Sequence, residues 1–312
     1  MTAQKIGFLF PGQGAQYVGM GRESVERSEK ARHLYEEADR ILGSSLSQIC
    51  FQGPEEMLTR TLYAQPAIFV TSLVLLQLLR EKSPDLKPQF VAGLSLGEFS
   101  ALAAAEVFSF SDGVKLVQVR AEAMEKAALE KRGAMISLLG LNKEACTAVA
   151  QESGAQLANL NAPDQFVLSG EESAIEKAAQ LAEAKGAKRA IRLKVSGAFH
   201  SLLMESARKR FSEALKKISL QNPRCLFAPN VTGRGESDPE KIRKLLSDQL
   251  THPVQWIETM EWARNQGVRR FIEIGPGRVL KGLAKRIDPS LEVFSLEKPS
   301  DLDAIESVLE KV

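Results

Sequence analysis

Gly93, Ser95 and Gly97 form a Gly-x-Ser-x-Gly motif. A short apolar stretch at residues 90–92 precedes the motif, and an alanine-rich stretch at 101–107 follows it. This strand–turn–helix context is that of a nucleophile elbow, in which glycines flank the serine because the turn leaves no room for side chains. The motif alone arises by chance in roughly one chain in ten of this length. Because the context removes most such accidents, we expect Ser95 to act as a nucleophile.

A serine hydroxyl is a weak nucleophile and needs an adjacent base. The chain has three histidines. His33 lies in the pattern of a charged surface helix, and His252 lies in a loop before a proline. His200 lies in a loop of small residues just before a helix, where an imidazole can point into a cleft. We therefore expect His200 to be the base, with a helix-capping or packing role as the alternative.

Arg120 is the other candidate for chemistry, because it is a lone arginine in the otherwise uncharged stretch 117–121. A guanidinium can bind a carboxylate through two parallel hydrogen bonds. A surface salt bridge is the alternative. The turn at residues 11–14, with Gly12 and Gly14, would let backbone approach a ligand closely. Tyr17 occupies the position of the third glycine of a dinucleotide fingerprint, and no Gly-Lys-Ser/Thr follows, so neither nucleotide loop fits.

Strands and helices must position these residues, and they alternate along most of the chain. This order predicts an α/β fold with a mostly parallel sheet covered on both sides. The continuous apolar run at residues 6–10 fits a central strand. Residues 131–196 instead follow the order β-α-β-β-α-β of a ferredoxin-like module. We expect a large α/β hydrolase-like core, residues 1–130 and 197–312, with a small ferredoxin-like subdomain at 131–196 inserted into it.

The sequence pattern also predicts further elements along the chain. Helices are expected at residues 24–42, 65–80, 112–129, 202–218 and 239–250, a strand at 225–230, and a loop at 251–256. The helix at 112–129 would begin with Asp112 as its cap.

Composition narrows the function classes. Of the 312 residues, 44% are hydrophobic and 26% charged, and the net charge of +2 creates no strong field toward nucleic acid or a membrane. The three cysteines are far apart, so we expect neither a disulfide framework nor a structural zinc site, and a reducing compartment is the default. The N-terminus lacks the pattern of a signal peptide. The longest apolar stretch, 67–79, is too short to span a bilayer and predicts a buried helix.

Together these residues resemble the malonyl-CoA:acyl-carrier-protein transacylase family, along nearly the whole chain. The matching segments are Phe-Pro-Gly-Gln-Gly-Ala-Gln at 10–16, Gly-Leu-Ser-Leu-Gly-Glu at 93–98, Arg-Ala-Glu-Ala-Met at 120–124, Asn-Ala-Pro-Asp-Gln-Phe-Val-Leu-Ser-Gly at 161–170, Gly-Ala-Phe-His-Ser at 197–201, Asn-Val-Thr-Gly at 230–233, Gln-Leu-Thr-His-Pro-Val-Gln-Trp at 249–256 and Glu-Ile-Gly-Pro-Gly at 273–277. One such segment would be a weak signal, but their joint order is highly specific.

The resemblance implies a ping-pong transfer. Ser95 would attack the thioester of malonyl-CoA with His200 as general base, which leaves a malonyl-serine ester. The phosphopantetheine thiol of acyl carrier protein would then take the malonyl group. In the family a backbone carbonyl orients the histidine, and the matching position is Gln249. The backbone N–H groups of Gln13 and Leu96 would form the oxyanion hole.

The resemblance also implies how the acyl group is chosen. Arg120 would bind the free carboxylate of the malonyl group, so that an acetyl group would leave a buried guanidinium unpaired. Phe199 resembles the malonyl-selective members, where its bulk is thought to exclude a 2-methyl branch. The resemblance further implies no cofactor, no metal, acyl carrier protein as partner and a role in fatty acid biosynthesis. We expect a cytoplasmic monomer that binds neither nucleic acid nor membrane.

Three other functions remain open at this stage. A serine esterase or thioesterase could use the same Ser95–His200 pair and would release malonate without an acceptor thiol. The acid of an α/β-hydrolase triad could lie between these two residues, although an insertion at 131–196 is not the usual hydrolase layout. A polyketide acyltransferase would load the same group onto another carrier. A non-catalytic scaffold would need a spoiled site, and none of the three main residues is missing.

Acyl carrier proteins are acidic, so a local basic surface is expected for docking. Two clusters qualify, one in the small module and one on a single helix. The first comprises Lys185, Lys188, Arg189, Arg192 and Lys194, and the second Arg208, Lys209, Arg210, Lys216 and Lys217.

Leu94 departs from the family, which usually has histidine just before the nucleophile. An apolar side chain therefore replaces a polar neighbour of the expected ester. We expect the pH dependence or the ester stability to differ from the family norm, and Leu94→His to shift one of them. The pH–rate profile and the hydrolysis rate of the acylated protein check this, and two unchanged profiles would refute it.

Overall fold

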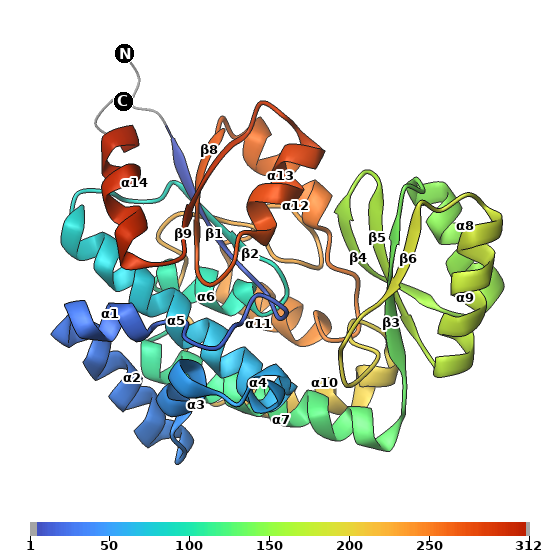
Figure 1. Cartoon of the computed structure of the whole chain (residues 1–312), viewed down its shortest axis with the longest axis horizontal. Coiled ribbons are helices and arrows are strands. Elements are labelled where there is room, and N and C mark those ends of the chain that lie inside the picture. The colour runs from blue at the N-terminus through green and yellow to red at the C-terminus, as the bar shows by residue number, and fades with distance from the viewer. Residues whose placement is uncertain (1–4, 310–312) are drawn as a thin grey trace.

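The large sheet of the protein contains five parallel strands in the order β7-β2-β1-β8-β9. The computed structural model describes residues 5–309 (Figure 1). The strands are β1 (Ile6–Phe10), β2 (Phe90–Gly93), β7 (Leu226–Phe227), β8 (Arg270–Ile274) and β9 (Glu292–Leu296). The predicted α/β fold with a parallel sheet is confirmed.

Helices cover both faces of this sheet, because its central strand is apolar on both sides. Phe8 and Phe10 pack into one core with the helices of the N-terminal half, whereas Leu9 packs into a second core with α12 and α13 (Figure 1). The helices of the large lobe are α1 (Arg22–Arg27), α2 (Glu29–Leu42), α3 (Leu46–Gln52), α4 (Glu55–Thr59), α5 (Thr61–Lys82), α6 (Gly97–Ala104), α7 (Phe110–Glu130), α10 (Glu205–Leu215), α11 (Pro239–Asp248), α12 (Trp256–Asn265), α13 (Val279–Ile287) and α14 (Leu302–Leu309).

A second, four-stranded antiparallel sheet forms a separate lobe, at the right of Figure 1. Its order is β4-β5-β3-β6, and its elements are β3 (Ala134–Leu139), α8 (Lys143–Ser153), β4 (Gln156–Ala162), β5 (Gln165–Gly170), α9 (Glu172–Ala184) and β6 (Arg189–Arg192). This element order is the predicted β-α-β-β-α-β. We propose 131–196 as the bounds of this small subdomain.

The two lobes are joined by backbone hydrogen bonds as well as by the chain. Val254, in the loop after α11, receives a hydrogen bond from the Leu160 N–H at 2.9 Å. Its own N–H donates to the Ala158 carbonyl at 2.8 Å. The loop thereby covers the edge of β4, and this contact fixes the small sheet against the segment that follows α11.

Helix α5 differs from the expected helix because it begins at Thr61 and contains Pro66. A proline in a helix removes one backbone hydrogen bond, so the sequence favoured a later start. Helix α5 is long and apolar enough to cross a membrane by length and composition, but 83% of its most apolar window is buried within the described protein. The tight packing of this core helix explains why it tolerates the proline.

Other boundaries also differ from expectation. The expected helix at 24–42 is divided by Ser28, whose side chain caps α2, and the cap of α7 is Ser109 rather than Asp112. The strand expected at 225–230 comprises only Leu226–Phe227. The helix at 202–218 is a 3₁₀ turn followed by α10, and Trp256 begins a helix, α12, that the sequence pattern did not reveal.

The two glycines of the elbow are required by close backbone contacts. A Cβ at Gly97 would lie 2.0 Å from the Phe10 carbonyl oxygen, and one at Gly93 would lie 1.9 Å from the backbone of Gly97. Strand β1, the start of α6 and the serine turn are therefore in direct backbone contact.

We expect Gly97→Ala to lower the free energy of unfolding by about 3 kcal/mol, because the clash involves backbone that cannot move aside. Gly282→Ala is the matched control, since a Cβ there meets nothing within 4 Å. In the interior of α13 the control should gain about 0.5–1 kcal/mol. Urea unfolding of both variants checks the prediction, and equal stabilities would contradict it.

Candidate active site

Ser95 lies between the end of β2 and the start of α6 in a left-handed conformation, with φ of 54°. Such a conformation is strained for a serine and must be held by its surroundings. Asn230 provides part of this support. Its Oδ1 accepts a hydrogen bond from the Ser95 N–H at 2.6 Å, and its Nδ2 donates to the Gly93 carbonyl at 2.7 Å. The side chain of one asparagine therefore fixes both sides of the turn.

His200 lies beside Ser95 in the loop that returns from the small subdomain. Its Nε2 is 2.8 Å from Ser95 Oγ, and its Nδ1 is 2.8 Å from the backbone oxygen of Gln249. A carbonyl oxygen can only accept, so the proton of a neutral imidazole belongs on Nδ1. Nε2 is then free to accept the hydroxyl proton of Ser95, which is the geometry that a general base needs.

The pKa of His200 is lowered to about 4, first by burial and then by the positive charge of Arg120. The backbone carbonyls near the ring oppose this shift only in part. His200 is therefore neutral throughout the physiological range, which is the protonation state that a base requires.

Arg120 is fully buried, so the alternative of a surface salt bridge is wrong. It comes from α7 and points at the serine. Nη2 donates to Ser95 Oγ at 3.1 Å and to Gln249 Oε1 at 2.8 Å, and Nη1 donates to Gln65 Oε1 at 2.6 Å. The guanidinium carbon lies 5.4 Å from the centre of the Phe99 ring.

All these contacts of Arg120 are with neutral groups. Burial lowers the pKa of Arg120 to about 10, and Glu98 partly opposes this shift. Within residues 5–309 no carboxylate lies in salt-bridge distance of the guanidinium. The side chain therefore remains charged at neutral pH beside the serine hydroxyl, where it could bind an anion.

Gln13 and Leu96 carry the expected oxyanion donors. Leu96 immediately precedes α6, and Gln13 follows β1 in the neighbouring turn. In the described part of the chain, neither backbone N–H is bonded to a protein acceptor. The Gln13 side chain donates to Thr61 Oγ1 at 3.1 Å and accepts from Gln65 Nε2 at 3.3 Å. These bonds hold the turn after β1 against α5.

A cavity of about 290 Å³ opens above the serine, between the two lobes. Its lining includes Ser95, His200, Gln13, Phe199 and Leu94 from the large lobe. Met135, Asn159, Val167 and Leu193 line it from the small lobe. His33 and His252 lie elsewhere on the exposed surface, beside Glu29 and Asp248 respectively. Arg120, Leu96 and Gln249 do not line this cavity, but Arg120 and Gln249 are hydrogen-bonded to Ser95, and Leu96 follows Ser95 in the chain.

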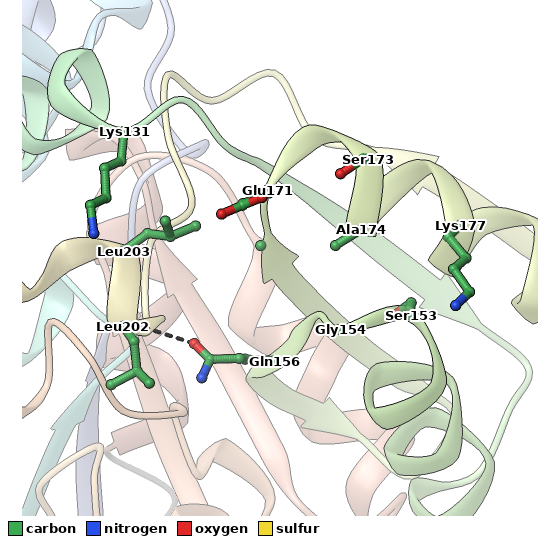
Figure 2. Close-up of a pocket in the computed structure, with 11 residues that line it drawn as sticks. Lys131, Ser153, Gly154, Gln156, Glu171, Ser173, Ala174, Lys177, Leu202 and Leu203 are labelled. Atoms are coloured by element: carbon green, nitrogen blue, oxygen red, sulfur yellow. Dashed lines mark hydrogen bonds between the residues drawn. The ribbon is translucent and has the colours of Figure 1, made fainter.

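A larger hollow, of about 570 Å³, lies where the small lobe meets the turn after His200. Figure 2 shows Lys131 and Leu203 on one side of it and Ser173 and Lys177 on the other. The Leu202 N–H donates to Gln156 Oε1 at 2.8 Å across its base. None of Ser95, His200 or Arg120 lines this hollow. We therefore expect the chemistry in the smaller cavity.

Sequence reasoning missed three residues that support the site, namely Gln65, Glu98 and Asn230. Glu98 and Asn230 lie within two of the matching segments, which was a usable signal, but their contacts with Gln249 and Ser95 depend on the fold. No sequence pattern indicated a role for Gln65, because the hydrogen bond that it accepts from Arg120 joins positions 55 residues apart.

Comparison with known proteins identifies the class of enzyme. The family model of the acyl transferase domain matches residues 7–288. Combined with the fold, this match defines the class as an acyltransferase.

Individual relatives define the family more narrowly. The malonyl CoA-acyl carrier protein transacylase of Bacillus subtilis (strain 168) is 42% identical over 313 residues, which cover 98% of each protein. An acyl-carrier-protein-S-malonyltransferase structure from Bartonella henselae has a TM-score of 0.94 and 39% identity, and covers 98% of this chain and 100% of that one. The chain belongs to the malonyl-CoA:acyl-carrier-protein transacylase family.

One solved relative contains a carrier protein. It is a malonyl-transacylase in complex with its type II PKS acyl-carrier protein. The identity is 37%, the TM-score is 0.93, and the match covers 99% of this chain and 100% of that one.

The lowered pKa of His200 generates a prediction for acid pH. A base must be neutral, and His200 is neutral above a pKa of about 4. We expect kcat/KM for malonyl-CoA to stay flat as the pH falls from about 7 to about 5, whereas a histidine with the usual pKa of about 6.5 would already lose most of its activity. The pH–rate profile checks this, with circular dichroism as the control for folding. An activity that halves near pH 6.5 would contradict it.

Proposed function

We propose that this protein transfers the malonyl group of malonyl-CoA to the phosphopantetheine thiol of acyl carrier protein, as a step of fatty acid biosynthesis. One observation carries the proposal. Ser95 Oγ is hydrogen-bonded to His200 Nε2 and, at 3.1 Å, to the buried guanidinium of Arg120. A nucleophile, its base and a carboxylate-binding group thus converge on one atom, and they would engage an acyl group that carries a carboxylate.

The first half-reaction forms an ester. His200 Nε2 takes the proton of Ser95 as Oγ attacks the thioester carbonyl. The N–H groups of Gln13 and Leu96 stabilise the resulting oxyanion. The carbon–sulfur bond then breaks, the sulfur of CoA receives the proton from His200, and malonyl-Ser95 remains. The Gln249 carbonyl stabilises the imidazolium through Nδ1.

The second half-reaction reverses these steps with a different thiol. The carrier's phosphopantetheine thiol gives its proton to His200 and attacks the ester carbonyl. When the tetrahedral intermediate collapses, Ser95 Oγ leaves and recovers the proton. No electron is gained or lost and no water is consumed, so the proposal includes neither a metal nor a cofactor.

Specificity for the malonyl group follows from the burial of Arg120. The malonyl carboxylate would give the guanidinium the anionic partner that it lacks in the free protein. An acetyl group has no carboxylate and would leave the charge unpaired, which is costly for a buried guanidinium. Phe199 lines the same cavity and would restrict substituents on the carbon between the two carbonyls.

The proposal extends to the location and the oligomeric state of the protein. We place the protein in the cytoplasm, because its three cysteines are free thiols, as is usual in a reducing compartment. We also propose that it acts as a monomer and that it binds neither nucleic acid nor membrane, in line with its net charge of +2.

The carrier would dock on the basic cluster of the small lobe. In the described structure Lys188, Arg189 and Lys194 of this cluster are exposed and have no salt-bridge partner. Lys194 lies between Leu193 and Val195, which line the active cavity. The α10 cluster is less suitable, because Arg208, Arg210 and Lys216 pair with Glu205, Glu130 and Glu213.

Intact-mass spectrometry tests the central proposal. Mixing with malonyl-CoA should give a malonyl adduct that is lost on addition of phosphopantetheinylated carrier, with a matching mass gain on the carrier. Ser95→Ala should give no adduct. An adduct that decays to free malonate at the same rate with or without carrier would instead establish the esterase. A protein that forms no adduct with any acyl-CoA would be a scaffold.

Charge reversal tests the docking surface. We expect the double variant Lys188→Glu/Lys194→Glu to lower kcat/KM for the carrier by about fivefold to tenfold, because rim charges mainly govern association. The matched control is Lys209→Glu/Lys217→Glu on α10. Acylation by malonyl-CoA is measured separately to isolate the carrier step. A larger loss in the control would place the docking surface on α10.

A further inference from the structure

Glu98 is a buried carboxyl that the reaction above does not use. It lies in the first turn of α6, 1% exposed, and accepts a hydrogen bond from Gln249 Nε2. The backbone of Asn230 lies near it and lowers its pKa. Both partners hold Ser95, since Gln249 Nε2 donates to the Ser95 carbonyl at 3.0 Å and Asn230 Oδ1 accepts from the Ser95 N–H. Glu98 therefore binds one of the two side chains that fix the strained serine and lies near the backbone of the other.

Glu98 is also the acid that acts electrostatically on Arg120. One amide separates the two groups, because Gln249 binds Glu98 through Nε2 and Arg120 through Oε1. Burial raises the pKa of Glu98 to about 8, and Arg120 partly opposes the shift. Around this cluster the charged or titratable groups are Arg120 from α7 and His200 from the loop before α10, while α5 contributes the neutral Gln65.

We propose that Glu98 is a positioning residue whose carboxylate takes up a proton from solvent when an acyl carboxylate binds beside Arg120. This inference rests on the proposed function. Above the pKa of Glu98, its ionised form partly balances the guanidinium in the free protein. A bound malonyl carboxylate would replace it in that role, and two anions beside one cation disfavour each other. One proton then adds to Glu98, and no bond to the substrate forms or breaks.

Protonated Glu98 can still accept the hydrogen bond from Gln249, so the support of Ser95 survives the change. The sign of the pH dependence follows from linkage. Below the pKa of Glu98 the carboxyl is already neutral, and binding takes up no proton. Above it, each bound malonyl group requires one, so the affinity for malonyl-CoA falls by up to tenfold per pH unit.

Titration calorimetry on Ser95→Ala tests the proton uptake, because this variant cannot be acylated and its heat reports binding alone. Malonyl-CoA is titrated in two buffers of different ionisation enthalpy, at about pH 6.5 and about pH 8.5. We expect almost no uptake at the lower pH and about three-quarters of a proton per site at the higher one, for a group with a pKa of about 8. His200 contributes nothing at either pH, because its pKa of about 4 is far below both.

A second substitution assigns the proton to Glu98. Ser95→Ala/Glu98→Gln should bind without uptake at either pH. The matched control is Ser95→Ala/Glu273→Gln, which removes another fully buried carboxyl, one that accepts hydrogen bonds from the Leu280 and Lys281 N–H groups at the start of α13. The control should keep the uptake. A kinetic check uses Glu98→Gln alone, which should lose the rise of KM above about pH 8.

The possible results distinguish a failure of this inference from a failure of the proposed function. Binding to Ser95→Ala with no uptake at the higher pH would overturn the inference and leave the function intact, whether or not Glu98→Gln folds. Uptake that persists in the Glu98→Gln double variant would overturn it as well. No binding of malonyl-CoA at either pH would overturn the proposed function and this inference with it.

Discussion

The burial of the Arg120 guanidinium is the constraint on which the site depends. Removing an isolated charge from water costs several kcal/mol even after the protein relaxes. The side chain receives neutral acceptors, Gln65, Gln249 and Ser95, and the face of Phe99. Its Nε has no partner among the described residues. The fold thus holds a cation without a full counter-charge, an arrangement that an anionic ligand completes.

Gln249 shows how one residue couples the parts of the site. Its backbone oxygen orients His200, and its side-chain amide contacts Arg120, Glu98 and the Ser95 carbonyl. It lies at the end of α11, five residues before Val254, whose backbone is bonded to β4. His200 itself follows the small subdomain in the chain. The position of the small lobe and the geometry of the dyad are therefore linked through two short segments, 197–200 and 249–254.

The sequence allowed prediction of those features that depend on local pattern. The strand at 6–10 was predicted to the residue, and the elbow at Ser95 was recognisable because its glycines are needed within five positions. Arg120 was visible only as an isolated charge, since its burial results from the packing of α7 against distant elements. Asn230 and Glu98 have partners 135 and 151 residues away, so no local pattern could define their contacts. The roles of Ser95, His200 and Arg120 in turnover stay predictions.

The electrostatics of the free site also bear on which acyl group would react. Arg120 is the second cause of the low pKa of His200, after burial. A weak base takes a proton from serine less readily, so the free protein holds a poorly activated nucleophile. A carboxylate bound beside Arg120 would offset part of that charge, while burial, the first cause, would still hold the pKa of His200 well below its usual range. An acyl group without a carboxylate would leave the base weak. In the proposed reaction, Arg120 would therefore discriminate twice, once by binding the carboxylate and once because His200 is the stronger base when that carboxylate is present.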